Sequence, residues 1–125
     1  MKELVLLTVA ISLLYIVLPI ISIWTFLRSL IKWDIRILKV WWFRTAIAID
    51  KLGNVIGAPF FNDTFIKKGG YQFGNPDETI SSVLGKNYRD NTLTKFGGFF
   101  RVALDFIEKD HCINSINENL TNTRK

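Results

Sequence analysis

The longest run of apolar positions lies at the start of the chain and predicts a membrane-spanning helix. The 24 residues from Leu4 to Leu27 contain no charged side chain. A helix rises about 1.5 Å per residue and a bilayer core is about 30 Å thick, so about 20 such residues can cross it. Pro19 is compatible with a span, because Ser and Thr side chains and the preceding turn can satisfy freed backbone groups. We expect residues 1–34 to form a transmembrane anchor and its flanks.

A cleaved secretion signal is the alternative explanation of this run. A signal has a basic amino-terminal region, an apolar core of about 7 to 15 residues and small residues at its cleavage site. Here Lys2 and Glu3 cancel, the apolar run is longer, and its exit, residues 23–28, is bulky. We therefore expect an anchor that stays in place.

The next pattern, over residues 35–57, has a helical period and predicts a basic amphipathic helix. The expected apolar side holds Leu38, Trp41, Trp42, Thr45, Ile49, Leu52 and Ile56, and the polar side holds Arg36, Lys39, Arg44, Asp50, Lys51 and Asn54. Such a helix is typical of the membrane interface. We expect it to end near Gly57, because Ala58-Pro59 is a stop signal.

A second transmembrane helix over the same residues is the competing interpretation, and it would give a two-span hairpin as in many holins. Each central charge costs about 2.5 to 3.5 kcal/mol on insertion scales, and Arg44 is too central to snorkel. Assembly into an aqueous pore could hide these charges. The single span is favoured, with the hairpin as the alternative.

Residues 58–74 are rich in aromatic residues and glycine and show no helical period. They fit either two short strands turning at Gly69-Gly70 or a loop laid on the membrane through its aromatic side chains. Two strands alone are only marginally stable in water. We therefore expect the loop.

Residues 75–116 predict a small helical module, followed by a polar tail over residues 117–125. Asn75, Pro76, Asp77 and Glu78 match the start of a helix, which would end near Gly85. Thr94 is expected to cap another helix, with Arg101 and Asp105 as an exposed pair four residues apart. Its expected buried face is formed by Phe96, Phe99, Phe100, Ala103, Phe106 and Ile107. The fold class expected from all these patterns is an all-α membrane protein.

Charge changes the picture by giving an orientation. The chain carries a net charge of +5, and residues 28–51 hold six basic and two acidic side chains. Since Lys and Arg beside a span resist translocation, we expect the amino terminus outside and the module in the cytoplasm. The single cysteine, Cys112, excludes an internal disulfide and fits a reducing compartment.

The expected partner of this basic segment is a bilayer with anionic headgroups, which attracts each nearby basic residue by about 1 kcal/mol. Nucleic acid is the less favoured partner, because the same residues serve membrane orientation. A protein partner or self-association is also expected. The expected membrane-surface contacts are Arg28, Lys32, Trp33, Arg36, Lys39, Trp41, Trp42 and Arg44.

Several polar side chains between positions 50 and 112 could come together in one site if the helices pack against each other. This candidate polar cluster comprises Asp50, Asn54, Asp77, Glu78, Ser81, Ser82, Asp105, His111 and Cys112. Asp50, Asp77 and Glu78 would be its Mg²⁺ ligands. Helix capping and ion pairing explain these carboxylates more simply, and no known metal motif is present.

His111 and Cys112 are the other residues with recognisable chemistry. As neighbours on a helix they point about 100° apart, so they cannot form a catalytic dyad with each other. One His and one Cys fall short of the four ligands of a zinc site, and we expect them to end the last helix. No enzyme activity and no cofactor are expected.

Three segments carry a resemblance: residues 44–57, residues 74–85 with Pro-Asp-Glu-Thr-Ile-Ser-Ser, and residues 110–116 with His-Cys. Together they resemble a pattern in small uncharacterised phage and prophage proteins. The long aromatic insert between Gly57 and Gly74 and the anchor depart from that pattern. The resemblance implies a viral origin, in a host inner membrane or a virion membrane, and assigns no catalytic residues.

Three functions follow as hypotheses. The favoured one is a phage-type single-pass protein with a structural or interaction role. The contact with its partner would be made by the basic side of the second helix together with five aromatic residues, Phe60, Phe61, Phe65, Tyr71 and Phe73. The first alternative is a lysis or membrane-permeabilising protein, holin-like or a lysis accessory. The second is a metal-dependent enzyme at the membrane surface.

Overall fold

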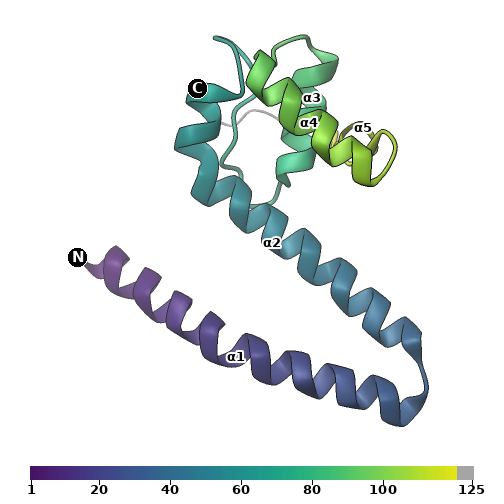
Figure 1. Ribbon diagram of the computed structural model, residues 1–125. Helices are drawn as coiled ribbons and strands as arrows, with labels where there is room; N and C mark the ends of the chain where they lie inside the picture. Colours follow the sequence, from purple (N-terminus) through teal and green to yellow (C-terminus); the bar gives the residue numbers. More distant parts are fainter. Residues whose placement is uncertain (121–125) are drawn as a thin grey trace. The chain divides into compact units, whose positions relative to one another are not determined.

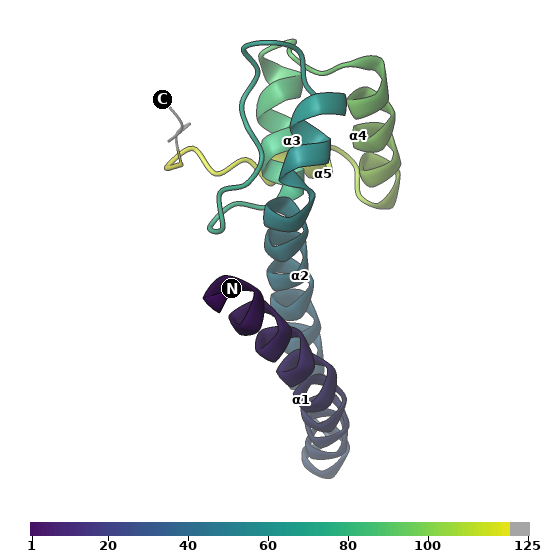
Figure 2. The ribbon, with the colours of Figure 1, turned by 90° about the vertical axis from the view of Figure 1, so that its left-hand side faces the viewer.

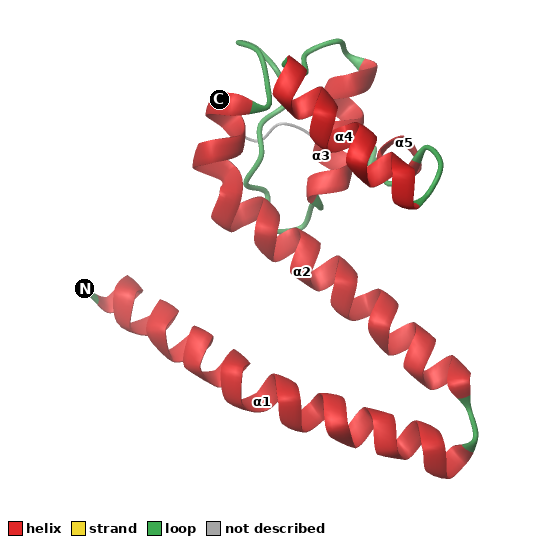
Figure 3. Ribbon diagram, in the orientation of Figure 1, coloured by secondary structure: helices red, strands yellow, loops and turns green. Residues whose placement is uncertain are grey.

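The structure, a computed structural model, describes residues 1–120 and is all-helical in that range (Figure 3). Five helices are present and no strand is formed among the described residues; Ile66 and Leu93 make an isolated bridge. The chain divides into two units, Met1–Thr45 and Ala46–Lys125, which we treat separately. From here on we call this second unit the module; it begins earlier in the chain than the module predicted over residues 75–116. The expected all-helical class and the long apolar first helix are confirmed.

Helix α1, Lys2–Lys32, is the one described helix that is long and apolar enough to cross a membrane. None of its most apolar stretch is buried by the rest of the chain. Its hydroxyl groups are satisfied within the helix, since Ser22 donates to the Leu18 carbonyl at 2.6 Å and Thr25 to the Ile21 carbonyl at 2.8 Å. Such bonding lets a polar side chain sit in a helix without an outside partner.

Helix α2, Ile35–Thr64, follows a short turn and starts where the Asp34 carboxylate accepts a hydrogen bond from the Arg36 N–H at 3.0 Å. The predicted end near Gly57 was wrong, because the helix continues through Pro59. Proline inside a helix costs about 3 kcal/mol. The turn beyond it is held by the module: Ala58 is buried and the Phe61 ring stacks on Phe65 at 4.7 Å.

The core of the module is aromatic, and it corrects the predicted membrane-lying loop. Phe65 and Phe73 are fully buried and Tyr71 is half-buried. They pack with Val83 and Leu84 of α3, Ile80–Arg89, around which the module's other elements gather (Figure 1). Each buried aromatic ring removes a large apolar area from water, so these side chains stabilise the core rather than lie on a membrane.

Helix α3 begins later and ends later than predicted. Its N-cap is Thr79, whose Oγ1 accepts from the Ser82 N–H at 3.1 Å. Asn75 instead closes a turn, accepting from the Asp77 N–H through its Oδ1 at 3.0 Å. The helix passes through Gly85, where a Cβ would clash with the Cys112 carbonyl oxygen. The glycine therefore permits a close approach of helix α5, His111–Asn114.

Helix α4, Lys95–Ile107, is capped by Thr94 as predicted, with the Gly97 N–H donating to Thr94 Oγ1 at 3.2 Å. Its predicted buried face was wrong in part: the rings of Phe96 and Phe100 contact the buried Phe65, but Phe106 is 92% exposed and Ile107 82%. The Arg101–Asp105 ion pair is formed, but both side chains are largely buried rather than exposed. A short helix α5, His111–Asn114, packs against α3 and α4.

Candidate functional site

The most unusual feature of the module is an ion pair sealed inside it. Glu78, Ser82 and Lys86 follow one another at four-residue spacing, so they lie along one side of α3 and the turn before it. Lys86 Nζ lies 2.7 Å from Glu78 Oε1, and the two side chains are 3% and 0% exposed. Burying two charges is expensive unless their remaining hydrogen-bonding positions are filled.

Those positions are filled by neighbours. Ser82 Oγ donates to Glu78 Oε1 at 2.6 Å, and the Tyr71 hydroxyl donates to Glu78 Oε2 at 2.7 Å. Lys86 Nζ also donates to the Leu120 carbonyl at 2.7 Å and lies 4.2 Å from the centroid of the Tyr71 ring. Burial and the negative charge of Glu78 raise the pKa of the Tyr71 hydroxyl, which keeps it a donor.

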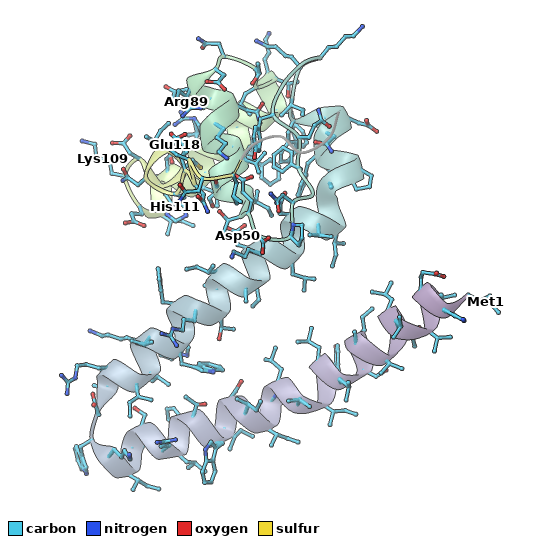
Figure 4. The ribbon with its side chains drawn as sticks, turned by 180° about the vertical axis from the view of Figure 1, so that it is seen from behind. Met1, Asp50, Arg89, Lys109, His111 and Glu118 are labelled. Atoms are coloured by element: carbon cyan, nitrogen blue, oxygen red, sulfur yellow. The ribbon has the colours of Figure 1, made fainter. Side chains whose placement is uncertain are left out.

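Residues 117–120 cover this pair. The Asn117 N–H donates to Ser82 Oγ at 3.0 Å, and Arg89 Nη1 contacts Glu118 Oε1 at 2.6 Å. Figure 4 labels Arg89 and Glu118, which come from α3 and from the C-terminal segment. The segment after α5 is therefore part of the module.

A second polar group joins α2 to the turn before α3. Asn54 is fully buried; its Nδ2 donates to the carbonyls of Asn75 and Glu78, at 2.9 and 2.7 Å. Asp50, labelled in Figure 4, accepts from the Ile80 N–H at 3.0 Å and from Ser81 Oγ at 3.1 Å. The side of α2 that enters the module is thus the predicted polar side, whereas Ile49 and Ile56 of the predicted apolar side are exposed.

Two further amides hold the segment between α2 and α3. Asn87 accepts from the Tyr71 N–H at 2.8 Å and donates to the Tyr71 carbonyl at 2.8 Å. Asn62 makes the equivalent pair of bonds with Phe73, at 2.8 and 3.2 Å. Side-chain amides can replace the strand partner that an irregular backbone lacks, because each offers a donor and an acceptor.

The predicted polar cluster does not converge on one point. Asp50, Asn54, Glu78, Ser81 and Ser82 lie in the two groups above, but Asp77 is exposed and contributes no cap. Asp105 pairs with Arg101 and accepts a hydrogen bond from the Cys112 N–H at 3.0 Å.

His111 contacts Glu108 at 2.9 Å and opens α5 rather than ending α4, so that prediction was wrong. Among the described residues, no group of three or more His, Cys, Asp or Glu side chains is placed to hold a metal ion.

Cys112 is a buried thiol with a suppressed acidity. Burial, and then the negative charge of Asp105, raise the pKa of Cys112 to about 12. Since the thiolate is the nucleophilic form, this side chain is inert at neutral pH. Its role is in packing against α3.

Sequence reasoning missed Lys86, Asn62 and Asn87 as buried polar residues, and it assigned Tyr71 to a binding contact rather than to the ion pair. Lys86 was missed because charged residues are seldom fully buried. The spacing of Glu78, Ser82 and Lys86 was the available signal. Every buried side-chain nitrogen and oxygen of the described residues has a hydrogen-bond partner, so this network is saturated.

The expected membrane-surface contacts lie in the first unit or at its end. All are exposed except Trp41, which is half-buried, so their charges and rings are free to meet a headgroup layer. Comparison of the chain with family models, with curated proteins and with solved structures gives no match.

Proposed function

We propose that this is a single-pass integral membrane protein whose helical module has a structural or interaction role rather than a catalytic one. The observation that carries the proposal is α1, an apolar helix whose most apolar stretch has no residue buried by the part of the chain that the structure describes. Exposing so many apolar side chains to water is unfavourable by about 25 cal/mol per Å², and a bilayer removes that cost.

The module's polar groups support an interaction role over catalysis. A catalytic carboxylate or thiol needs access to substrate and a tuned proton affinity. Glu78 is instead enclosed by Lys86, Ser82 and Tyr71, and the Cys112 thiol is buried. In our proposal this network fixes the shape of the module, and binding is left to its surface.

The orientation belongs to the same proposal. Arg28, Lys32, Arg36, Lys39 and Arg44 are exposed, and they would keep their side of the span in the cytoplasm against anionic headgroups. Because three segments resemble a pattern in phage and prophage proteins, we propose a host inner membrane or a virion membrane as its location.

A lysis protein that inserts α2 as a second span is less well supported. The later half of α2 is engaged in the module: Asp50 and Asn54 bond the turn before α3, and Ala58 is buried. Insertion would break those bonds and leave the polar groups in hydrocarbon, at several kcal/mol each. If α2 did insert, Arg44→Ala would hasten killing of an expressing cell, because insertion would become cheaper.

The proposal is tested by extraction of the full chain from membranes. We expect the wild-type chain to remain in the pellet after a urea wash, and a chain with Leu13→Arg and Ile16→Arg to be released. The matched control replaces two exposed module residues, Phe99 and Val102, with arginine and stays in the pellet. Release of the wild-type chain would overturn the single span.

A further inference from the structure

Helix α4 shows solvent a continuous apolar face. Phe99, Val102 and Phe106 are 68%, 55% and 92% exposed and follow one another at helical spacing. Ala103 and Ile107 are also exposed on this face. Phe96 and Phe100, which are 46% and 40% exposed, lie at its edge, with ring centroids 5.2 and 4.7 Å from that of the buried Phe65. No charged residue interrupts it. We call these seven residues the α4 face.

The opposite side of the helix fixes this orientation. At Gly97 a Cβ would clash with the Phe65 carbonyl oxygen, so the backbone of α4 lies directly on the core. Arg101 lies 4.0 Å over the Tyr88 ring and pairs with Asp105, and Leu104 packs against the buried cluster. The α4 face therefore cannot turn inward without loss of these contacts.

Lysines border the α4 face at its amino-terminal end and along one edge. Lys95 is exposed at that end, and a groove of about 340 Å³ runs along the edge, whereas Lys109 at the other end stands between the exposed carboxylates of Glu108 and Asp110. The groove is lined by Lys67, Tyr88, Asn91, Leu93, Gly98, Arg101 and Val102. Lys67 Nζ donates to the Asn91 carbonyl at 3.1 Å and has no carboxylate partner among the described residues, so its charge is available to an anion.

We propose that the α4 face rests in the interface of an anionic bilayer, with acyl chains against its phenylalanines and a lipid phosphate beside Lys67 in the groove. This inference rests on the proposed single span, because an anchored module is confined to the membrane surface at high effective concentration. An aromatic face with basic flanks is the composition of interfacial helices.

The experiment uses the full chain with Cys112→Ala, reconstituted in vesicles of phosphatidylglycerol and phosphatidylcholine and carrying one nitroxide spin label. Labels are placed on the α4 face by Val102→Cys and Phe106→Cys. Matched controls are Asp77→Cys and Asn119→Cys, which are exposed; the segment after α5 leads away from α4 in Figure 2. Collision with oxygen, which enters lipid, is compared with collision with a water-soluble nickel chelate.

We expect an oxygen-to-nickel collision ratio several-fold higher at residues 102 and 106 than at 77 and 119. The ratio should fall to the control value in vesicles of phosphatidylcholine alone, and also for residue 102 in the Lys67→Gln, Lys95→Gln variant. A high nickel collision rate at 102 and 106 would overturn the inference. Low collision with both reagents would also overturn it, because a protein surface would then cover the face.

A label at Leu14→Cys separates this inference from the proposed span. A lipid-exposed label at 14 with water-exposed labels at 102 and 106 would leave the span standing and refute the α4 contact. A water-exposed label at 14 would refute the span itself.

Discussion

Replacing Lys86 with methionine should cost the module about 3 to 5 kcal/mol, the usual loss when one partner of a buried ion pair is removed. The substitution deletes the 2.7 Å contact with Glu78 and the 2.7 Å bond to the Leu120 carbonyl. Glu78 keeps two hydroxyl donors, but its charge stays in a site with 0% exposure. Unfolding free energies of about 0.05 to 0.15 kcal/mol per residue give this module only about 4 to 12 kcal/mol in total.

A double-mutant cycle makes the reasoning quantitative. Glu78→Gln should also destabilise the module, since it leaves the Lys86 ammonium buried without a counter-ion. The chain with both substitutions has no buried charge here, so its loss should be smaller than the sum of the two single losses. We expect a coupling energy of about 2 to 3 kcal/mol. Arg89→Met is the matched control, because that side chain is 46% exposed and its pair with Glu118 should contribute less than about 1 kcal/mol.

The assay is thiol labelling of the full chain in lipid nanodiscs. Cys112 is the only cysteine and is fully buried, so its labelling rate under native conditions reports opening of the module. Tryptophan fluorescence would not serve, since Trp24, Trp33, Trp41 and Trp42 all lie outside the module. A loss below about 1 kcal/mol for Lys86→Met, or a coupling energy near zero, would refute the buried pair.

Three further outcomes are expected. Gly85→Ala should destabilise the module by about 3 kcal/mol or more in the same thiol assay, because its Cβ would clash with the Cys112 carbonyl. Gly98→Ala should be neutral or stabilising, because a Cβ there meets open space. Equal effects of the two substitutions would refute the close approach of α5. Thr79→Ala should lower the free energy of unfolding by about 1 kcal/mol in a denaturant titration, because Thr79 is the N-cap of α3. Asp77→Ala should lower it by less than about 0.5 kcal/mol. A larger loss for Asp77→Ala than for Thr79→Ala would restore the capping role that the sequence predicts for Asp77. The pKa of Cys112 rises from 9.0 to about 12 on folding, so the unfolded chain loses this proton at a lower pH than the folded chain. Above pH 9 the stability of the wild type should therefore fall more steeply than that of Cys112→Ala, by up to about 1.4 kcal/mol per pH unit. Parallel stability profiles by circular dichroism would contradict the buried thiol.

The features that the sequence could predict depend on local pattern. The uncharged run of α1 and the helical class follow from composition and period, and Thr94 is followed by a clear helical run that it caps. The start of α3 was misplaced because two capping residues, Asn75 and Thr79, lie close together. The hydrogen bonds from the Asp77 N–H to Asn75 Oδ1 and from the Asn54 side chain to the Asn75 carbonyl show that the first of them closes a turn.

The features that could not be predicted depend on which surfaces meet. The rings of Phe65 and Phe106 are equally apolar, but Phe65 is buried and Phe106 is exposed because Gly97 sets the backbone of α4 against the core. The same holds for α2, whose polar side enters the module because Asp50 and Asn54 satisfy backbone groups there. Hydrophobic period alone gives no such information.

The central claim is that α1 crosses the membrane once and holds the module on the other side. It is tested by single cysteines introduced at Glu3 and Lys109 in a Cys112→Ala background, with an impermeant maleimide added to intact cells. Both positions are exposed, as Figure 4 shows for Lys109. We expect labelling at position 3 from outside and at position 109 only after the cells are lysed. Labelling of both positions from outside, or of neither, would place the two ends on one side and contradict the single span.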